Sequence, residues 1–372
     1  MLNTVETPRR RAPGLIGILP RSKYGPVEEA RAIRESLKMA RGCTRALPVW
    51  YGNRVIGMAT GRDWYTDWAG FKPMGQWCGF TDYSDMISEL SSGKKYGFIW
   101  AKAATTAGVA NNWYDLWTVT GNPAPGDFAG TALTSRQFND TTTGSIWHGG
   151  NKSTDTKHFL SGWVMASTGS FNYMLTDRVL SYDSNTFTAN TNQNFTTTLT
   201  AQRYATNGDL GLIVSFVTDT VHNATGVDIN ALSYTDNAGN TGQAMPTTPT
   251  VSTIVSGAAP TANLGARVFA PATSGATVTW GYAMPLANGD TGVQKLEAIT
   301  TSAARTGTFA AVLHQPLIYI PTVLSNIISE KDFVAMTPGL ARIIDGACLN
   351  IWHLTSSTGG PNINGACETG WG

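Results

Sequence analysis

Residues 168–182 read TGSFNYMLTDRVLSY, and residues 306–320 repeat much of that stretch as TGTFAAVLHQPLIYI. Each copy opens with Thr-Gly, a hydroxyl residue and Phe, and continues as an apolar run bounded by turn residues, which is typical of a β-strand. The copies lie too far apart in the sequence for a short solenoid repeat. We therefore expect either two equivalent edges of one large sandwich or two related β units in tandem.

Composition limits the kind of partner that the chain can have. Its 372 residues have room for one large domain or for two to three ordinary ones. The net charge of +1 argues against nucleic acid as the bulk partner. Only 14% of the residues are charged, against roughly 25% in ordinary soluble domains. We expect other subunits, including copies of this chain, to cover much of its surface.

Cysteine usage and hydropathy indicate the compartment. No two cysteines have C-x-x-C spacing, so we expect neither a zinc site nor a disulfide framework but four reduced thiols: Cys43, Cys78, Cys348 and Cys367. The first 20 residues hold too short an apolar run for a signal sequence, and no window approaches 18 apolar residues. We expect folding in a cytoplasm, with no membrane partner.

The N-terminal quarter differs in composition from the rest of the chain. Residues 24–42, YGPVEEARAIRESLKMARG, predict a helix over about 26–41, with Pro26 at its start and Gly42 at its end. A shorter helix is predicted within 81–93, ending at Gly93. The aromatic-rich segment 45–80 is interpreted as irregular. Together these form a predicted N-terminal arm over residues 1–95.

The remainder, residues 96–372, is predicted to be a β domain. No glutamate occurs between Glu89 and Glu297, and no lysine between Lys157 and Lys295, so the middle of the chain lacks common helix formers. Ten stretches with strand-like composition alternate with turn residues: 158–166, 171–182, 195–204, 210–218, 229–235, 250–257, 276–286, 293–301, 308–320 and 347–354. The predicted fold is mainly β, a jelly-roll-like antiparallel β-sandwich of one body or two related halves, after a short helical and irregular N-terminal region.

Patterns that would indicate an enzyme are weak in this sequence. There is no P-loop and no G-x-S-x-G elbow. Asp155 and His158 could form a dyad or bind a metal, but a loop histidine is the simpler interpretation. Segment 236–240, DNAGN, has calcium-like oxygen spacing, although a hairpin turn explains it better. We predict no catalytic residue, no metal and no cofactor.

Two features are candidates for an interface. Arg9, Arg10 and Arg11 lie in the predicted arm and could bind an acidic surface, or form an ordinary solvated tail. Trp113, Tyr114 and Trp117 crowd three aromatics into one short stretch. Such a cluster is either a recognition hot spot or a contact that joins the N-terminal region to the sandwich.

Several stretches together resemble structural proteins of tailed-bacteriophage virions. They span roughly residues 100–372 and comprise NNWYDLWTVTGNPAPGDFAG, TKHFLS, LTDRVLSY, QRYATNGDLGLIVSF, LSYTDNAGNTG, PLIYIP and LARIIDGACLNIWHL. The resemblance implies an architectural role without an active site. Within a virion we expect a capsid-associated protein, such as a minor capsid, vertex or cement (decoration) protein, because a β-sandwich can bridge neighbouring shell subunits through large, partly polar interfaces. Its partners would be the major capsid protein or other virion proteins, and copies of itself in a homo-oligomer.

Two alternatives stay open at this stage. A jelly roll can also bind carbohydrate, and Trp147, Trp163 or Trp280 could stack on sugar rings in a tail-associated receptor-binding protein. A polysaccharide hydrolase would need two carboxylates. Asp155 and Asp177 are the candidates for that role.

Overall fold

The computed structural model of the chain describes the following residues: 18–19, 47–51, 54–59, 80, 83–106, 108–153, 155–169, 171–197, 203–204, 211–221, 229–246, 260–269, 282–322, 324–336, 340–355 and 360–372. The chain divides into two compact units, Met1–Ser91 with Gly372, and Ser92–Trp371. The predicted helix over about 26–41 and the basic residues Arg9, Arg10 and Arg11 lie outside the described residues.

The first unit contains a small sheet and one short helix. β1 (Ile18–Leu19) runs parallel to β2 (Leu47–Tyr51), which pairs antiparallel with β3 (Arg54–Ala59). The prediction of irregular structure over 45–80 is therefore wrong for this hairpin. The sequence pattern that could have predicted this hairpin is the Gly52-Asn53 pair between two apolar runs, because such a pair favours a tight turn.

The short helix predicted within 81–93 is confirmed as α4 (Tyr83–Ser91). Gly93 follows it with φ of 94°, a conformation that glycine adopts without the steric cost of a Cβ. Among the described residues, no helix is long and apolar enough to cross a membrane.

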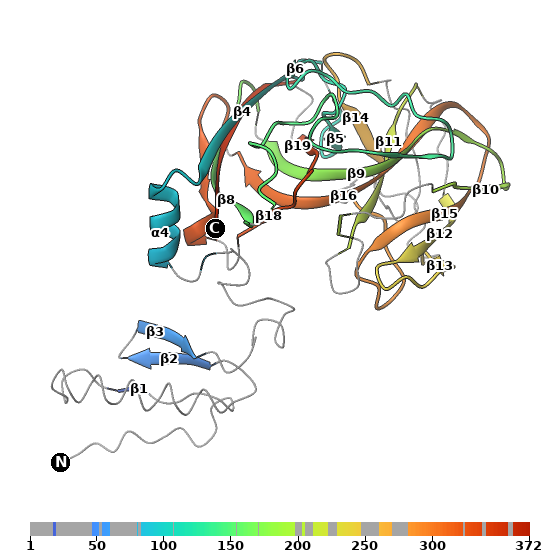
Figure 1. Cartoon of the computed structure of the whole chain (residues 1–372). Coiled ribbons are helices and arrows are strands. Elements are labelled where there is room, and N and C mark those ends of the chain that lie inside the picture. The colour runs from blue at the N-terminus through green and yellow to red at the C-terminus, as the bar shows by residue number, and fades with distance from the viewer. Residues whose placement is uncertain are drawn as a thin grey trace. The chain divides into compact units, whose positions relative to one another are not determined.

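The second unit consists of three antiparallel sheets (Figure 1). The first has the order β17-β8-β20-β4-β6, and β18 also pairs with β8. Its elements, with the short helix α5 that follows β17, are β17 (Ser329–Asp332), α5 (Phe333–Met336), β8 (Lys157–Ala166), β20 (Asn362–Trp371), β4 (Lys95–Ala103), β6 (Gly121–Asn122) and β18 (Arg342–Ile343). The second has the order β10-β15-β12-β13. Its strands are β10 (Asn192–Asn194), β15 (Val293–Thr301), β12 (Ile229–Asp236) and β13 (Gln243–Ala244). The prediction of a mainly β, antiparallel, sandwich-like fold is confirmed.

The third sheet closes on itself. Its order is β16-β11-β14-β5-β19-β9-β7, and β16 pairs with β9 as well as with β11. Six strands thus form a ring, which we call the closed sheet, and β7 adds to β9 beside it. The strands are β16 (Arg305–Pro321), β11 (Ile213–Thr218), β14 (Ala266–Phe269), β5 (Trp113–Asp115), β19 (Leu349–Thr355), β9 (Phe171–Phe187) and β7 (Ser135–Gln137).

The duplicated stretches are the two longest strands, and they pair with each other. β9 and β16 contain 17 residues each and run antiparallel from Asn172↔Pro321 to Phe187↔Arg305. The expectation that the copies form two equivalent edges is therefore wrong. Because the pairing is antiparallel, the two copies begin at opposite ends of one long ribbon, which crosses the unit in Figure 1.

This ribbon connects three hydrophobic cores. Phe171, at the start of the first copy, packs between the closed sheet and the sheet of β8 and β20. Phe309, in the second copy, packs between the closed sheet and the sheet of β12 and β15. On β16, Phe309, Ala311 and Leu313 face that core, whereas Ala310 and Val312 belong to the third core, inside the closed sheet. The alternation follows from the period of two in a strand.

Some strands were not predicted. β4 and β20 lie beside each other in the first sheet, yet β20 contains two glycines and two asparagines, which weaken a strand signal. A Cβ at Gly365 would lie 2.1 Å from the Trp100 ring, so this glycine makes room for the indole. Of the predicted strands, 250–257 lies outside the described residues, and the described parts of 195–204 and 276–286 are not strands.

Candidate binding surface

The aromatic cluster predicted as an interface lies inside the second unit. Trp113 and Tyr114 are on β5, Trp117 follows it, and all three side chains are buried. The Trp117 indole donates a hydrogen bond to the Asp127 carbonyl at 3.0 Å and meets the Phe138 ring edge to face. These residues build the core around the closed sheet. They are not a surface hot spot.

Beside Trp117, the closed sheet buries an ion pair. Arg178 on β9 and Asp115 on β5 are fully buried, with 2.7 Å between Nη1 and Oδ2. Asp115 also accepts hydrogen bonds from Asn350 and from the backbone N–H of Trp117. Burial raises the pKa of Asp115, and the Arg178 charge opposes that rise. The carboxylate thus has partners on several sides.

Aromatic rings surround the other side of the Arg178 guanidinium. Its central carbon lies 4.9, 5.1 and 4.7 Å from the ring centroids of Trp117, Phe128 and Phe138. Nε and Nη2 have no hydrogen-bond partner among the described residues. The negative faces of aromatic rings attract a desolvated cation, so this cage takes the place of those bonds. The cluster is structural, and its components come from strands far apart in the sequence.

The residues proposed for hydrolysis have structural partners. Asp177 is buried and pairs through both oxygens with Arg203, and it accepts the Cys348 backbone N–H at 2.8 Å. Asp155 lies 3.3 Å from the Lys94 ammonium. His158 is buried, with Nδ1 3.1 Å from the Leu340 carbonyl. The other ring nitrogen of His158, Nε2, has no hydrogen-bond partner among the described residues, so His158 forms no dyad with Asp155.

A serine and a histidine that the sequence did not single out meet inside the closed sheet. Ser215 Oγ on β11 lies 2.9 Å from His314 Nε2 on β16, and both residues are fully buried. The Ser215 hydroxyl also donates to the Tyr282 carbonyl, so His314 Nε2–H must donate to Ser215 Oγ. Burial lowers the pKa of His314 to about 3, and the Arg178 charge acts in the same direction. In this arrangement His314 does not accept the serine proton.

A buried lysine fixes the loop that carries Trp147. Lys157 Nζ donates to His148 Nδ1 and to the His148 carbonyl, each at 2.9 Å, and to the Gly150 carbonyl. These three acceptors use all the hydrogens of its ammonium group. Burial lowers the pKa of Lys157 to about 8. Trp147 stacks on the His148 ring, and 52% of its surface stays exposed.

The other residues proposed to bind sugar or calcium differ from Trp147. Trp163 is half-buried on β8, and Trp280 lies outside the described residues. Segment 236–240 is a turn between β12 and β13, in which Asn240 bonds to both Asp236 oxygens. The hairpin-turn interpretation is confirmed. In the part of the chain that the structure describes, no three His, Cys, Asp or Glu side chains gather as a metal site would.

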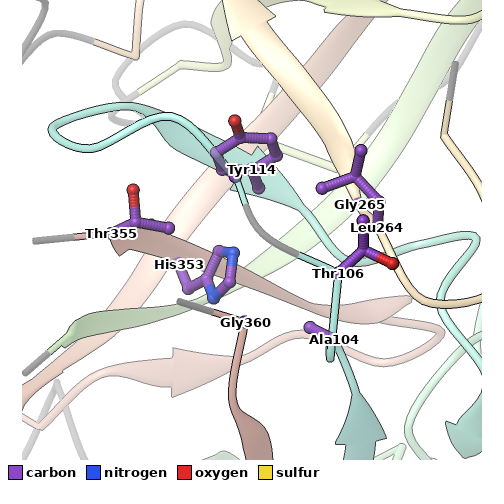
Figure 2. Close-up of a pocket in the computed structure, with 9 residues that line it drawn as sticks. Ala104, Thr106, Tyr114, Leu264, Gly265, His353, Thr355 and Gly360 are labelled. Atoms are coloured by element: carbon purple, nitrogen blue, oxygen red, sulfur yellow. The ribbon is translucent and has the colours of Figure 1, made fainter. Parts of the chain in front are cut away.

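Figure 2 shows a cavity beside Tyr114, where Thr106, His353, Thr355 and Gly360 line a space between strand ends. Its volume is about 10 Å³, enough for one water molecule and too small for an organic ligand. His353 Nδ1 is buried and has no protein partner among the described residues. Burial lowers the pKa of His353 to about 3, which favours the neutral imidazole.

Exposed apolar side chains concentrate at one edge of the first sheet. Leu324, Ile327 and Ile328 have 58%, 52% and 56% of their surface exposed. The Asn326 backbone N–H donates to the Ala166 carbonyl of β8 at 2.7 Å, and β17 continues along β8 from Ser329↔Val164 to Asp332↔Ser161. We call residues 326–332 the edge segment.

The edge segment combines apolar and charged side chains on a fixed backbone. Its first half carries the two exposed isoleucines, and its second half carries Glu330, Lys331 and Asp332. The Lys331 ammonium bonds to the Tyr319 carbonyl at 3.1 Å and lies over the Phe333 ring. Contiguous exposed apolar groups with a polar rim are typical of a protein-binding surface. The edge segment is therefore the candidate binding surface.

No protein-family model, curated protein or solved structure matches the chain.

Proposed function

We propose that the chain is a non-enzymatic structural component of a tailed-phage virion. In this role it is capsid-associated, as a minor capsid, vertex or cement protein, and binds neighbouring virion subunits such as the major capsid protein. The proposal begins with the resemblance of residues 100–372 to virion structural proteins. The low fraction of charged residues suits a subunit whose surface is largely covered.

The observation that carries the proposal is the edge segment. Two exposed isoleucines lie between Asn326 and β17, which both hydrogen-bond to β8, so they are presented without a large ordering cost on binding. A partner that covers them removes apolar surface from water. Leu324, two residues before the segment, is also exposed.

Quantitative mass spectrometry of gradient-purified virions tests this role, with emptied heads and detached tails measured separately. We expect the chain in heads, at a copy number tied to the symmetry of the shell or vertex. Replacing Ile327 and Ile328 by serine should lower that copy number, while Ile99→Ser, an exposed isoleucine on β4, serves as the control. Absence of the chain from heads and tails alike would overturn the virion assignment.

A second function, glycan binding in a tail-associated receptor-binding protein, is favoured by Trp147. Its indole is half exposed and is held in place by the His148 ring, which the buried Lys157 fixes in turn. A fixed, exposed aromatic face is the kind of surface on which sugar rings stack. We expect binding on a glycan array to be lost in Trp147→Ala and kept in Trp163→Ala. No bound glycan with the unmodified chain would remove this alternative.

A further inference from the structure

We propose that Asn288 is a modification site, at which the folded chain converts its own asparagine into aspartate and isoaspartate through a cyclic imide. The sequence contains three Asn-Gly pairs, at 207–208, 288–289 and 364–365. Glycine after asparagine favours this reaction, because no Cβ hinders the approach of the glycine nitrogen to the asparagine side chain. The first pair lies outside the described residues. The fold separates the other two.

The reaction needs water as its co-reactant. The Gly289 backbone nitrogen gives its proton to solvent and bonds to the side-chain carbonyl carbon of Asn288. The bond between that carbon and Nδ2 then breaks, and ammonia leaves. Water opens the imide at either of its carbonyls, which leaves the main chain running as aspartate or, through the side chain, as isoaspartate. The net reaction turns one amide and one water into one carboxylic acid and one ammonia.

Both reacting groups are accessible at the turn that contains Asn288. The Asp290 N–H donates to the Ala287 carbonyl at 3.1 Å, so Asn288 and Gly289 are the two central residues of this turn, and both are exposed. Gly289 has φ of 98°, which glycine adopts without strain. Among the described residues, no hydrogen bond engages the Asn288 side chain or the Gly289 N–H. A Cβ at Gly289 would meet no atom within 4 Å, so the surroundings leave room for the imide.

The pair Asn364-Gly365 has the same chemistry in a closed environment. Both residues lie on β20, an interior strand between β8 and β4. Gly365 is buried beneath the Trp100 ring, and the N–H groups of an interior strand bond to one neighbouring strand or the other. The Gly365 nitrogen can react only after these strands separate. Opening of a core strand costs free energy, whereas an exposed turn needs little or no opening.

Modification at Asn288 would alter the attachment of a core residue. Tyr234 on β12 is fully buried, and its hydroxyl donates to Asp290 Oδ2 and accepts the Ala287 N–H, each at 2.7 Å. Asn288 lies between these two partners in the sequence. Isoaspartate would lengthen the main chain between them by one methylene, and either product would add a negative charge near Asp290.

The test compares each asparagine with itself in the folded and the denatured chain. The purified full chain is incubated at mildly alkaline pH, with and without guanidinium chloride, and peptide mass spectrometry measures aspartate plus isoaspartate at each position over time. We expect the folded rate at Asn288 to stay within about threefold of its denatured rate. At Asn364 the folded rate should fall on the order of tenfold or more below the denatured rate. Comparison of a position with itself removes the effect of neighbouring sequence.

Asn288→Gln is the control variant, because it keeps a side-chain amide but would have to close a larger, less favourable ring. The product at position 288 should disappear from the peptide map, while the rates at Asn364 stay unchanged. Circular dichroism before incubation checks that the variant and the unmodified chain are folded. A folded rate at Asn288 that falls as far below its denatured rate as the rate at Asn364 does would overturn the proposal.

Discussion

The interior of the closed sheet buries a guanidinium and a carboxylate, whereas the edge segment leaves two isoleucines in solvent. Inside, Arg178 has a paired carboxylate and three aromatic rings within its own chain. At the edge, Ile327 and Ile328 stay half exposed. A buried charge persists only where the fold supplies partners. Exposed apolar groups next to a strand that is fixed in a sheet instead favour a partner from outside the chain.

The largest expected effect comes from breaking the buried ion pair. Arg178→Met leaves the Asp115 carboxylate buried without its cation, and should lower the free energy of unfolding by about 3–5 kcal/mol. Urea denaturation at pH 7.5 measures the loss. Adding Asp115→Asn to Arg178→Met should recover part of it, because no uncompensated charge is left. A loss below about 1 kcal/mol would contradict a structural role for this pair.

A comparison of a buried tryptophan with an exposed one tests how differently the interior and the surface of the chain respond to the same substitution. Trp117→Phe removes the hydrogen bond to the Asp127 carbonyl and part of the ring that contacts Arg178, and should cost about 2 kcal/mol. Trp147→Phe, at an exposed position, should change the free energy of unfolding by less than about 0.5 kcal/mol. Chemical denaturation of both variants under one condition checks this. Similar losses in the two variants would contradict the placement of Trp117 in the core.

Buried histidines predict that acid destabilises the fold. Burial lowers the pKa of His314 and His353 to about 3, and of His148 and His158 to about 4. Unfolded histidine has a pKa near 6.5, so between that pH and the folded pKa the unfolded chain binds more protons. Stability is full above about pH 6.5 and falls as the pH drops toward 3 to 4. Asp115, whose pKa is raised, acts in the opposite direction at the acid end.

His353→Phe isolates one of these contributions. His353 stacks on Phe171, and a phenyl ring can keep that contact, so stability at pH 7.5 should change little. Below pH 6.5 the slope of stability against pH should decrease by about 1.4 kcal/mol per pH unit. Urea denaturation at pH 7.5, 6.5, 5.5 and 5.0 gives both quantities. An unchanged slope would show that His353 is protonated in the folded state as readily as in the unfolded one.

The smallest effect is expected at the edge segment. Ile327→Ser and Ile328→Ser remove side chains that are half exposed, and should change the stability of the monomer by less than about 0.5 kcal/mol each. Thermal unfolding at low protein concentration measures this without association. Ile320→Ser, a buried position on β16, is the contrasting control and should be strongly destabilising. A large loss at Ile327 or Ile328 would mean that the segment stabilises its own chain.

Local patterns were sufficient for several elements. The turn at 236–240, helix α4 and the strands β8, β9, β11, β12, β15, β16 and β19 follow from neighbouring residues whose periodicity or turn chemistry is visible in a short window. For the described thiols, Cys348 and Cys367, the prediction of free cysteines is confirmed. β20 could not be predicted in this way, because Gly365 is required by the Trp100 ring, a contact between two strands.

The location of the candidate binding surface could not be predicted from a short stretch of sequence. Trp113, Tyr114 and Trp117 have a composition that suits either a surface cluster or a core, and only their burial decides between the two. Ile327 and Ile328 resemble ordinary core residues in the sequence. Their exposure depends on where β8, and with it the edge of the sheet, lies.

The sequence by itself determined a mainly β chain, its turns, the duplicated strand motif and a shortage of surface charge, because these properties depend on residue type and on near neighbours. The tertiary structure decided that the duplicated strands pair with each other, that Arg178 meets Asp115 and that the edge segment is exposed. These features come from residues distant in the chain, and strand pairing across such separations is set by which apolar faces can be buried together.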